Sequence, residues 1–361
     1  MSKSLSINDN TTKFTRREFL GTAAAMTAFT IIPRSVLGGV GYTAPSDMVN
    51  LAAIGVGNQG GGDIQNIATP DVPIKRGMKL NGMMMQPYGG IQAPRRPRRA
   101  SDNPIQMGDA GKETFHHANI YAICDVDHDY AAPIIAGYPK AKLYQDFREM
   151  IDKEKEIDAV LIATPDHTHA VIASYAMNAG KHVFVEKPMA KTIYETRFLR
   201  DLAKKTGVVT QMGNQGHNIE GTYQTVEWIR SGLIGDVREV HLWSNRPMWR
   251  QGYFTRPEGV AVPKNLNYDV WLGPAPEKPY HPDILHFAWR GLWDYGTGAM
   301  GDMGAHTFDA PIWALDLGMP TKIQATTTPF NNDYLPQSEF VTYEFPARGN
   351  KPPVKVTWSD G

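Results

Sequence analysis

Asp302 and His306 stand four residues apart in the segment GDMGAHTFD, so a helix would carry both side chains on one face. Oxidation of a secondary alcohol needs a base for the hydroxyl proton, and an imidazole with a pKa of about 6.5 suits that role. Lys187, in the sequence EKP, adds an ammonium that can stabilise an oxygen anion. The three residue types therefore suit alcohol chemistry. The alternative is structural, with Asp302 as a helix cap and His306 as a hydrogen-bonded core residue.

A second pattern, formed by Gly55, Gly57 and Gly60, follows an apolar run and opens a helix-like segment. In that context the glycines permit a tight turn and let backbone amides approach a pyrophosphate at a helix N-terminus, although ordinary glycine-rich turns share the pattern. The ribose ligand of such a site is a carboxylate at the end of the second strand, which points to Asp125 in CDVD. A carboxylate there favours NAD over NADP, because it repels a 2′-phosphate. The alternative role for Asp125 is a helix N-cap before His128.

Short apolar segments alternate with helical ones through VNLAAIGVG, ANIYAICDVD, DAVLIATPD, HVFVEKP and VVTQMGN, with helices expected at 169–178 and 194–204. This alternation predicts a parallel sheet covered on both faces. A helix at 219–230, the strand-like VREVHLWS and an aperiodic stretch rich in Pro and Trp at 246–293 follow. We expect the aperiodic stretch to form a wall around a pocket.

The C-terminal part predicts one helix over residues 302–317 and strands at 322–328, 340–345 and 354–358. Helices followed by several strands indicate a mixed domain with a mostly antiparallel sheet. The chain ends directly after the last of these strands.

In their order along the chain, the glycine pattern, the EKP sequence and the Asp/His pair resemble the Gfo/Idh/MocA oxidoreductases, named for glucose-fructose oxidoreductase and inositol dehydrogenase. The resemblance covers about residues 48–361, apart from an insertion at 69–114. It implies an α/β chain with a Rossmann domain at 45–215, built on a doubly wound parallel sheet, and a C-terminal α+β domain at 216–361. Relatives usually continue beyond the last strand, so we expect a fragment or a shortened variant.

The resemblance assigns the catalytic work to Lys187, Asp302 and His306. We expect His306 to act as the base, Lys187 to orient the hydroxyl and stabilise the alkoxide, and Asp302 to fix the hydroxyl or the lysine; Lys187 and His306 are interchangeable in these roles. Glu186 would support the loop that carries Lys187, and Pro188 would fix its turn. The segment WRGLWDYGTG resembles the family's pocket segment, with substrate contacts expected from Trp289, Arg290 and Tyr295, although packing in the core is the alternative for each tryptophan.

The expected cofactor-binding residues come from the glycine pattern, the end of the second strand and the later strand ends. They are Gly55, Gly57, Asn58, Gln59, Gly60, Asp125, Thr164, Pro165, His167, His169, Glu186, Lys187 and Gln215. His167 and His169 alternate like a metal pair, but further ligands are not evident, so we expect no metal and ascribe them to capping or packing of the next helix. Further pocket candidates are His217, Tyr223, His281 and His286.

The N-terminal sequence TRREFL precedes a short apolar run, which is typical of a twin-arginine export signal. We expect residues 1–40 to be that signal, with the twin-arginine translocase as a partner and a periplasmic location without a membrane anchor. An amphipathic first helix is the alternative. The insertion contains RRPRR at 95–99, which we interpret as a solvated loop rather than an anion site, and a methionine run at 83–85.

The formal net charge is zero, with 37 basic and 37 acidic residues, so the chain has no long-range field to gather nucleic acid. A neutral, hydroxyl-rich sugar or polyol substrate would suit it. One cysteine excludes an intramolecular disulfide. Because the periplasm supplies no free NAD, we expect the dinucleotide to stay bound and to be regenerated in place. An oxidoreductase, an NAD-dependent glycosidase that oxidises C3 and eliminates at C2, and a non-catalytic sugar-binding protein remain open, as does homo-oligomerisation.

Overall fold

The computed structural model describes residues 47–74 and 118–361. The expected export signal and the arginine and methionine runs of the insertion lie outside the described residues. Both sheets belong to one compact unit, residues 49–361. No helix in the described part of the chain is both long and apolar enough to cross a membrane.

Six parallel strands form the first sheet, in the order β3-β2-β1-β4-β5-β6. The strand order runs outward in both directions from β1 and β4, which is the doubly wound arrangement that the alternation of strands and helices predicts. The prediction of an α/β fold with a parallel sheet is confirmed. The strands are β1 (Val49–Ile54), β2 (Ala118–Cys124), β3 (Lys142–Tyr144), β4 (Ala159–Ile162), β5 (His182–Glu186) and β6 (Thr210–Gly213).

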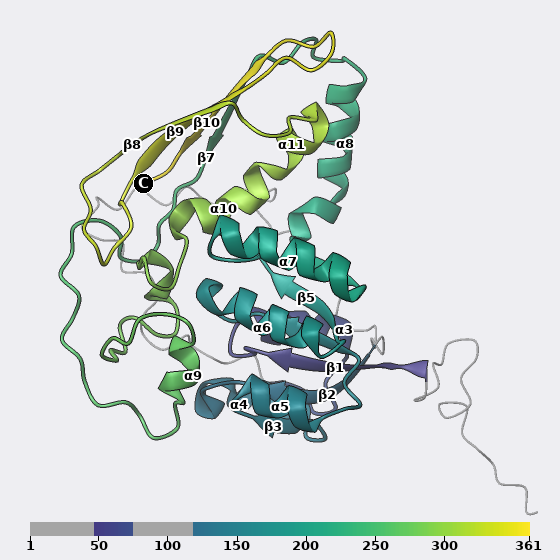
Figure 1. Cartoon of the computed structure of the whole chain (residues 1–361), viewed down its shortest axis with the longest axis vertical. Coiled ribbons are helices and arrows are strands. Elements are labelled where there is room, and N and C mark those ends of the chain that lie inside the picture. The colour runs from purple at the N-terminus through teal and green to yellow at the C-terminus, as the bar shows by residue number, and fades with distance from the viewer. Residues whose placement is uncertain (1–46, 75–117) are drawn as a thin grey trace, which may run out of the picture. The chain divides into compact units, whose positions relative to one another are not determined.

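Helices cover both faces of this sheet because its strands are apolar on both sides. Within β1, Ala52 and Ile54 contribute to one buried cluster, while Leu51 and Ala53 contribute to another, as expected from the two-residue repeat of a strand. The first cluster packs against α5 (Phe147–Lys153), α6 (Asp166–Asn178) and α7 (Ile193–Thr206), which lie side by side in Figure 1. The second packs against α3 (Gln59–Ile67) and α4 (His128–Gly137).

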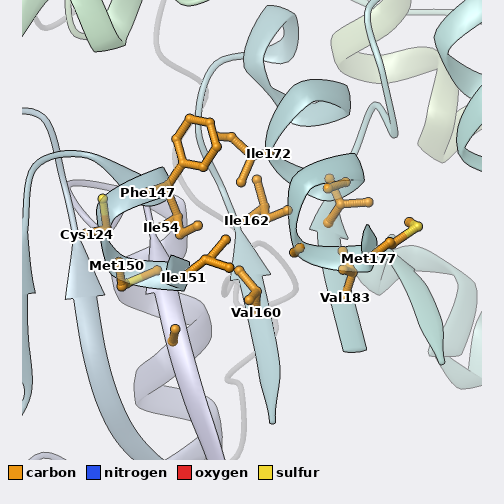
Figure 2. Close-up of a cluster of buried hydrophobic side chains, with 14 of the residues drawn as sticks. Ile54, Cys124, Phe147, Met150, Ile151, Val160, Ile162, Ile172, Met177 and Val183 are labelled. Carbon is orange, nitrogen blue, oxygen red and sulfur yellow. The ribbon is translucent and has the colours of Figure 1, made fainter. Parts of the chain in front are cut away.

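Figure 2 shows the first of these clusters, in which strand residues such as Ile54, Val160 and Ile162 face Phe147 and Ile151 of α5. Cys124, the single cysteine of the chain, is buried in this cluster.

Local sequence signals set the helix ends. Asp127 caps α4 by accepting hydrogen bonds from the amides of Asp129 and Tyr130. At α7, Thr192 and Glu195 form a reciprocal capping box, and the helix ends at Gly207 in the left-handed region, with φ 72°. The expected helix at 194–204 thus extends by one residue at its start and two at its end.

The second sheet has four strands in the order β7-β10-β9-β8. Two pairs are antiparallel, and β7 lies parallel to β10, so the prediction of a mostly antiparallel sheet is confirmed. Helices α8 (Glu220–Arg230) and α11 (Asp309–Leu315) lie beside this sheet in Figure 1, and Ile229 and Leu315 pack into its buried cluster. The strands are β7 (Glu239–Trp243), β8 (Lys322–Thr327), β9 (Glu339–Phe345) and β10 (Val354–Ser359).

The single helix expected at 302–317 is wrong in its extent. The structure has α10 (Gly298–Thr307) and α11, with a junction at Phe308. Pro311 explains the break, because it has no amide hydrogen to donate to the Thr307 carbonyl, as a continuous helix would require. Asp302 and His306 nevertheless lie on the same helix, α10.

The aperiodic stretch is organised by aromatic packing. It contains the short helices α9 (Tyr268–Leu272) and η4 (Ala288–Gly291), and its buried residues include Trp271, Tyr280 and Trp289. These large rings form a core of their own, which explains why the segment has no strand or helix period.

Candidate active site

A cleft opens at the carboxyl ends of the first sheet's strands, where α/β folds bind their ligands. It has an empty volume of about 870 Å³, including the space open to solvent. That volume is within the range of small-molecule sites. The predicted residues that line it are Gly55, Gly57, Asn58, Gln59, Asp125, Thr164, Pro165, Trp289 and Arg290. Nine of the predicted site residues thus lie together.

The glycine loop needs glycine for two different reasons. Gly55 has a φ of 79°, which glycine adopts without strain. At Gly60 a Cβ atom would lie 2.2 Å from the Gly55 carbonyl oxygen, and at Gly57 it would lie 2.2 Å from the Tyr130 ring. No side chain caps α3, although Asn58 at its N-cap lines the cleft. Uncapped amides beside a glycine cradle fit the pyrophosphate of a dinucleotide.

Asp125 lines the cleft, but its carboxylate also holds the loop in position. One oxygen accepts a hydrogen bond from the Val56 amide at 2.8 Å and the other from the Asp127 amide at 3.0 Å. Burial raises the pKa of Asp125 to about 6. The N-cap of α4 is Asp127, so the capping role considered for Asp125 belongs to its neighbour.

One wall of the cleft is built by a stacked pair of rings. The Tyr130 and His286 rings lie 3.9 Å apart at 7°, and the His286 Nε2 atom lies 3.2 Å from an Asp127 carboxylate oxygen. Both rings line the cleft. Burial lowers the pKa of His286, which favours the neutral ring. His286 was an unranked candidate in the sequence, and its place in the wall follows from the fold.

The predicted catalytic residues Lys187 and Asp302 are in direct contact, although 115 positions separate them. The Lys187 Nζ atom lies 3.0 Å from Asp302 Oδ1 and 2.9 Å from the Asp302 carbonyl oxygen. Lys187 follows β5 directly, and Asp302 projects from α10. Their side chains are 17% and 11% exposed, so the pair is shielded yet open to a small ligand.

His306, the third predicted catalytic residue, is held by Asn214 at the end of β6. The His306 Nδ1 atom lies 2.8 Å from the Asn214 side-chain oxygen, and the Asn214 amide nitrogen donates to the Ala305 carbonyl at 2.9 Å. This orientation of the amide makes Nδ1 the protonated nitrogen of the ring and leaves Nε2 as the acceptor. Burial, followed by the charge of Lys187, lowers the pKa of His306. The ring is thus suited to accept a proton at neutral pH.

Two arginines complete this cluster. Arg246 Nη1 lies 3.7 Å from one Asp302 oxygen, and Arg290 Nε lies 3.8 Å from the other. Arg290 stacks on the Trp289 ring, with 4.3 Å from the guanidinium carbon to the ring centre. Because Arg290 also lines the cleft, the charged cluster borders the glycine-loop site.

Some predicted residues lie elsewhere. Tyr295, expected to contact substrate, has no exposed surface, and its hydroxyl accepts from Arg256, so it is a core residue that supports the wall. His167 and His169, expected to line the cofactor, are buried in the first turn of α6 and do not line the cleft. Gln215 is exposed in a short helix after β6, outside the cleft lining.

The two histidines of α6 hold the backbone together. His169 places its ring nitrogens 2.8 Å from the Thr164 carbonyl and 2.7 Å from the Pro188 carbonyl, joining two loops of the site. His167 Nε2 lies 2.9 Å from the Trp271 carbonyl, and burial lowers its pKa to about 4. Within the described part of the chain no group of three His, Cys, Asp or Glu residues could hold a metal ion.

Glu186 is buried, and its carboxylate accepts from the Lys187 amide at 3.2 Å. The Lys187–Pro188 peptide bond is cis. Of the unranked candidates, His217 has its Nδ1 atom 2.8 Å from Asp309, Tyr223 packs edge-on against Trp313, and His281 accepts from the Asp283 amide. None of these three lines the cleft.

Sequence reasoning missed Asn214 and Arg246. Asn214 directly follows a predicted strand in VVTQMGN, so a search for polar residues at strand ends would have found it. Arg246 comes from the aperiodic stretch, where no period marks which side chains face a site. It could be placed only once the fold was known.

Two regions of the sequence match models of one oxidoreductase family, Gfo/Idh/MocA. Residues 106–214 match its "NAD-binding Rossmann fold", and residues 229–349 match its "C-terminal alpha/beta domain", the same two halves that the structure shows. The chain belongs to the Gfo/Idh/MocA oxidoreductase family. The first match begins at residue 106 and does not include the glycine loop. The interpretation of that loop as a cofactor site therefore depends on its geometry alone.

Several named proteins of known or assigned activity are similar to parts of the chain. It is 32% identical over 130 residues to an inositol 2-dehydrogenase of Salmonella typhimurium, covering 36% of this chain and 38% of that protein. It is 31% identical over 187 residues to a glycosyl hydrolase family 109 protein of Shewanella amazonensis, covering 44% and 41%. The chain thus spans less than half the length of these curated relatives.

A crystal structure of GenD2 from gentamicin A biosynthesis, in complex with NAD, has a similar fold. The TM-score is 0.55, and the likeness covers 88% of this chain and 67% of that one. The sequence identity is 17%, so the likeness concerns the fold alone.

Proposed function

We propose that this protein is an NAD-dependent oxidoreductase acting on a secondary alcohol of a sugar, polyol or glycoside. The observation that carries the proposal is the contact between Lys187 and Asp302 beside a neutral His306, at the border of a cleft with a glycine cradle. An ammonium, a carboxylate and an imidazole base are the groups that alcohol oxidation requires.

The cofactor would be held by the glycine loop, the uncapped N-terminus of α3 and Asp125. When bound, NAD supplies the acceptor for the hydride that leaves the alcohol carbon. Asp125 lies where a ribose 2′-phosphate would meet a carboxylate, which supports NAD over NADP. The dinucleotide site and the charged cluster meet at Arg290.

Each of the three catalytic residues has a separate task in this proposal. His306 takes the hydroxyl proton at Nε2, because Asn214 occupies Nδ1. Lys187 stabilises the negative charge that develops on the substrate oxygen, and Asp302 holds the ammonium in position through two oxygen contacts. This assigns the base to His306 and the electrostatic role to Lys187, one of the two distributions that the sequence left open.

The test uses purified protein and the absorbance band of reduced nicotinamide. Addition of sugar should produce the band in the wild-type protein, and Lys187→Ala should lower the rate by about a thousandfold while nucleotide stays bound. Lys155→Ala, at an exposed lysine, is the control and should react like the wild type. Unchanged turnover in Lys187→Ala would refute the catalytic role, and protein that never binds nucleotide would favour a sugar-binding protein.

A second candidate is a redox-neutral glycosidase, supported by the similarity to a glycosyl hydrolase family 109 protein. Oxidation at C3 of a glycoside would acidify the C2 proton, the aglycone would leave by elimination, and water addition with hydride return would complete hydrolysis. Chromatography separates the two candidates, because only the glycosidase releases a free aglycone. Lys187 stands in the EKP sequence, and the resemblance to the oxidoreductases assigns this lysine to catalysis. We therefore rank the oxidoreductase first.

We also propose export to the periplasm through the twin-arginine pathway, with NAD bound before export and recycled in place. The support is the sequence TRREFL ahead of a short apolar run. Replacement of Arg16 and Arg17 by Lys should retain the protein in the cytoplasm on cell fractionation. Equal export of the variant would contradict the proposal. A homo-oligomer is a further expectation, which sedimentation can check.

A further inference from the structure

The charged cluster has more cations than its carboxylates balance. Within 4 Å of Asp302 lie the side-chain nitrogens of Lys187, Arg246 and Arg290. Only Lys187 is close enough for a hydrogen bond, at 3.0 Å; the arginines lie at 3.7 and 3.8 Å. One carboxylate thus faces three cations.

Two other carboxylates, Asp166 and Glu186, lie nearby but form no ion pair with these three cations. Asp166 is buried, and its Oδ2 atom accepts from the Thr297 hydroxyl at 2.6 Å. Glu186 directs its carboxylate to the Lys187 amide and lies against Gly213. Burial raises the pKa of both acids. Asp302 alone among the described carboxylates lies within 4 Å of the nitrogens of all three cations.

The arginines are positioned to meet a ligand. Their side chains are 27% and 24% exposed at Arg246 and Arg290, and both guanidinium groups lie over the Trp249 ring, at 5.9 and 6.0 Å. Stacking fixes the plane of a guanidinium and leaves its edge available for paired hydrogen bonds to a carboxylate. Burial lowers the pKa of Arg290, and the charges of Asp166 and Asp302 oppose that shift.

We infer that Arg246 and Arg290 bind a carboxylate on the substrate, so that this enzyme acts on a sugar acid, a uronic or aldonic acid, in preference to a neutral sugar. The inference rests on the proposed function, and it names the substrate class of the same site. It differs from the neutral substrate that the overall charge suggests, because a local excess of positive charge decides binding more than the sum over the chain.

A phosphate of the dinucleotide is the other anion that could approach these residues. The glycine loop and the start of α3 already offer a phosphate site, and Arg246 does not line the cleft that they border. Arg246 comes instead from the segment after β7, on the side of Asp302. A variant of Arg246 therefore distinguishes a carboxylate on the substrate from a phosphate of the dinucleotide.

The experiment compares matched pairs of ligands: glucose with glucuronate and gluconate, and galactose with galacturonate. Calorimetry on the NAD-loaded protein should give at least about tenfold tighter binding of one or more of the acids, since hydrogen bonds between charged partners are stronger than those between neutral ones. Arg246→Gln and Arg290→Gln should each reduce this preference to about twofold or less. Arg238→Gln, at an exposed arginine, is the control that should retain it.

Equal or tighter binding of the neutral sugars by the wild type would overturn the inference, as would a preference that survives both variants. Weaker NAD binding in Arg246→Gln with an unchanged acid preference would assign the arginine to phosphate and overturn it as well. Failure of the proposed function looks different: no sugar of either class would then produce reduced nicotinamide. The ratio of binding constants is measured independently of that readout.

Discussion

The two halves of the molecule make their sites by different means. In the parallel sheet, both faces are covered by helices, and the site at the strand ends is formed mainly by backbone in the glycine loop. In the second half, every residue of β8 is exposed, and the residues that line the cleft are mostly charged or aromatic side chains, such as Trp271, His286 and Arg290. In the proposed function, the first half would supply a general cradle for the cofactor, and the second half would supply selectivity for the substrate.

Substitutions in the two halves should therefore have different effects. A backbone cradle tolerates no added atoms but needs few particular side chains. A cluster of charges tolerates changes of shape but depends on each member, because removing one partner leaves the others uncompensated. The following variants test this contrast, beginning with the largest expected effect.

Gly60→Ala should abolish nucleotide binding, with a loss of at least about a hundredfold in affinity, or prevent folding. The added Cβ would lie 2.2 Å from the Gly55 carbonyl oxygen and 2.9 Å from Ala163 Cβ, both of which are fixed parts of the site. Gly62→Ala is the matched control on α3, since nothing lies within 4 Å of its Cβ, and it should gain about 0.5–1 kcal/mol of stability. Calorimetric titration with NAD and thermal unfolding measure both. Normal NAD affinity in Gly60→Ala would contradict the cradle.

Asn214→Asp tests the second half, where one side chain orients another. The carboxylate would face His306 Nδ1 and favour the charged ring, so the pKa of His306 should rise and the acid limb of the kcat/KM profile should move to higher pH. Asn214→Leu should instead lower kcat by about tenfold to a hundredfold without that shift, because the ring loses its orientation. An unchanged pH profile in Asn214→Asp would exclude His306 as the titrating base.

Sequence alone predicted the cradle better than the charged cluster, for a physical reason. Gly55, Gly57 and Asp125 follow strands, whose period and apolar character are local properties of the chain. Lys187 and Asp302 were found by residue type, but their contact joins positions 115 apart and depends on the approach of α10 to the loop that follows β5. Arg246 lies in a segment organised by ring packing, which leaves no periodic signal.

The errors have the same origin. Tyr295 was expected in the pocket because the segment WRGLWDYGTG resembles the family's pocket segment, yet the turn after η4 directs it into the aromatic core. The helix expected at 302–317 was extended through Pro311 because the apolar pattern continues past it. Side chains that are close in sequence face different parts of the molecule where the chain turns. The local sequence pattern did not predict these turns.

His167 links the halves, since it projects from α6 and bonds the Trp271 carbonyl of the second half. Its pKa falls from 6.5 to about 4 in the folded protein, so the unfolded chain alone binds a proton between these values. Stability from the neutral ring is complete above pH 6.5 and is lost as the pH falls to about 4, by up to about 3 kcal/mol. His167→Gln keeps a hydrogen-bond donor but has no titrating ring. The wild type should therefore lose up to about 3 kcal/mol of unfolding free energy relative to this variant as the pH falls from 6.5 to about 4.

The control for this change is His128→Gln. His128 also places Nε2 near a backbone carbonyl, that of Tyr144 at 3.1 Å, but it is only half-buried. Urea unfolding at several pH values measures all three proteins, with other titrating groups cancelling in the differences. A wild-type curve parallel to that of His167→Gln between pH 6.5 and 4 would show that the ring is not kept neutral by the fold.

Asp63 gives the smallest expected effect and sharpens the contrast between the halves. It lies on α3, where its Oδ1 accepts from Gln59 while its buried Oδ2 has no hydrogen-bond partner among the described residues. Burial, followed by the charge of Glu186, raises its pKa from 3.8 to about 7. The folded protein therefore loses stability as the pH rises from 3.8 to about 7, because the unfolded carboxyl ionises first.

Asp63→Asn removes that cost, so the variant should become more stable than the wild type by about 1–2 kcal/mol at pH above 7 and by little at low pH. Asp201→Asn, at an exposed carboxylate, is the control and should show no such gain. Urea unfolding on either side of neutrality gives both differences. In the charged cluster, by contrast, removal of Asp302 would leave three cations together and should destabilise the fold. A loss of stability in Asp63→Asn above pH 7 would mean that the carboxylate has a favourable partner. The stability of the first half would then also depend on charged side chains.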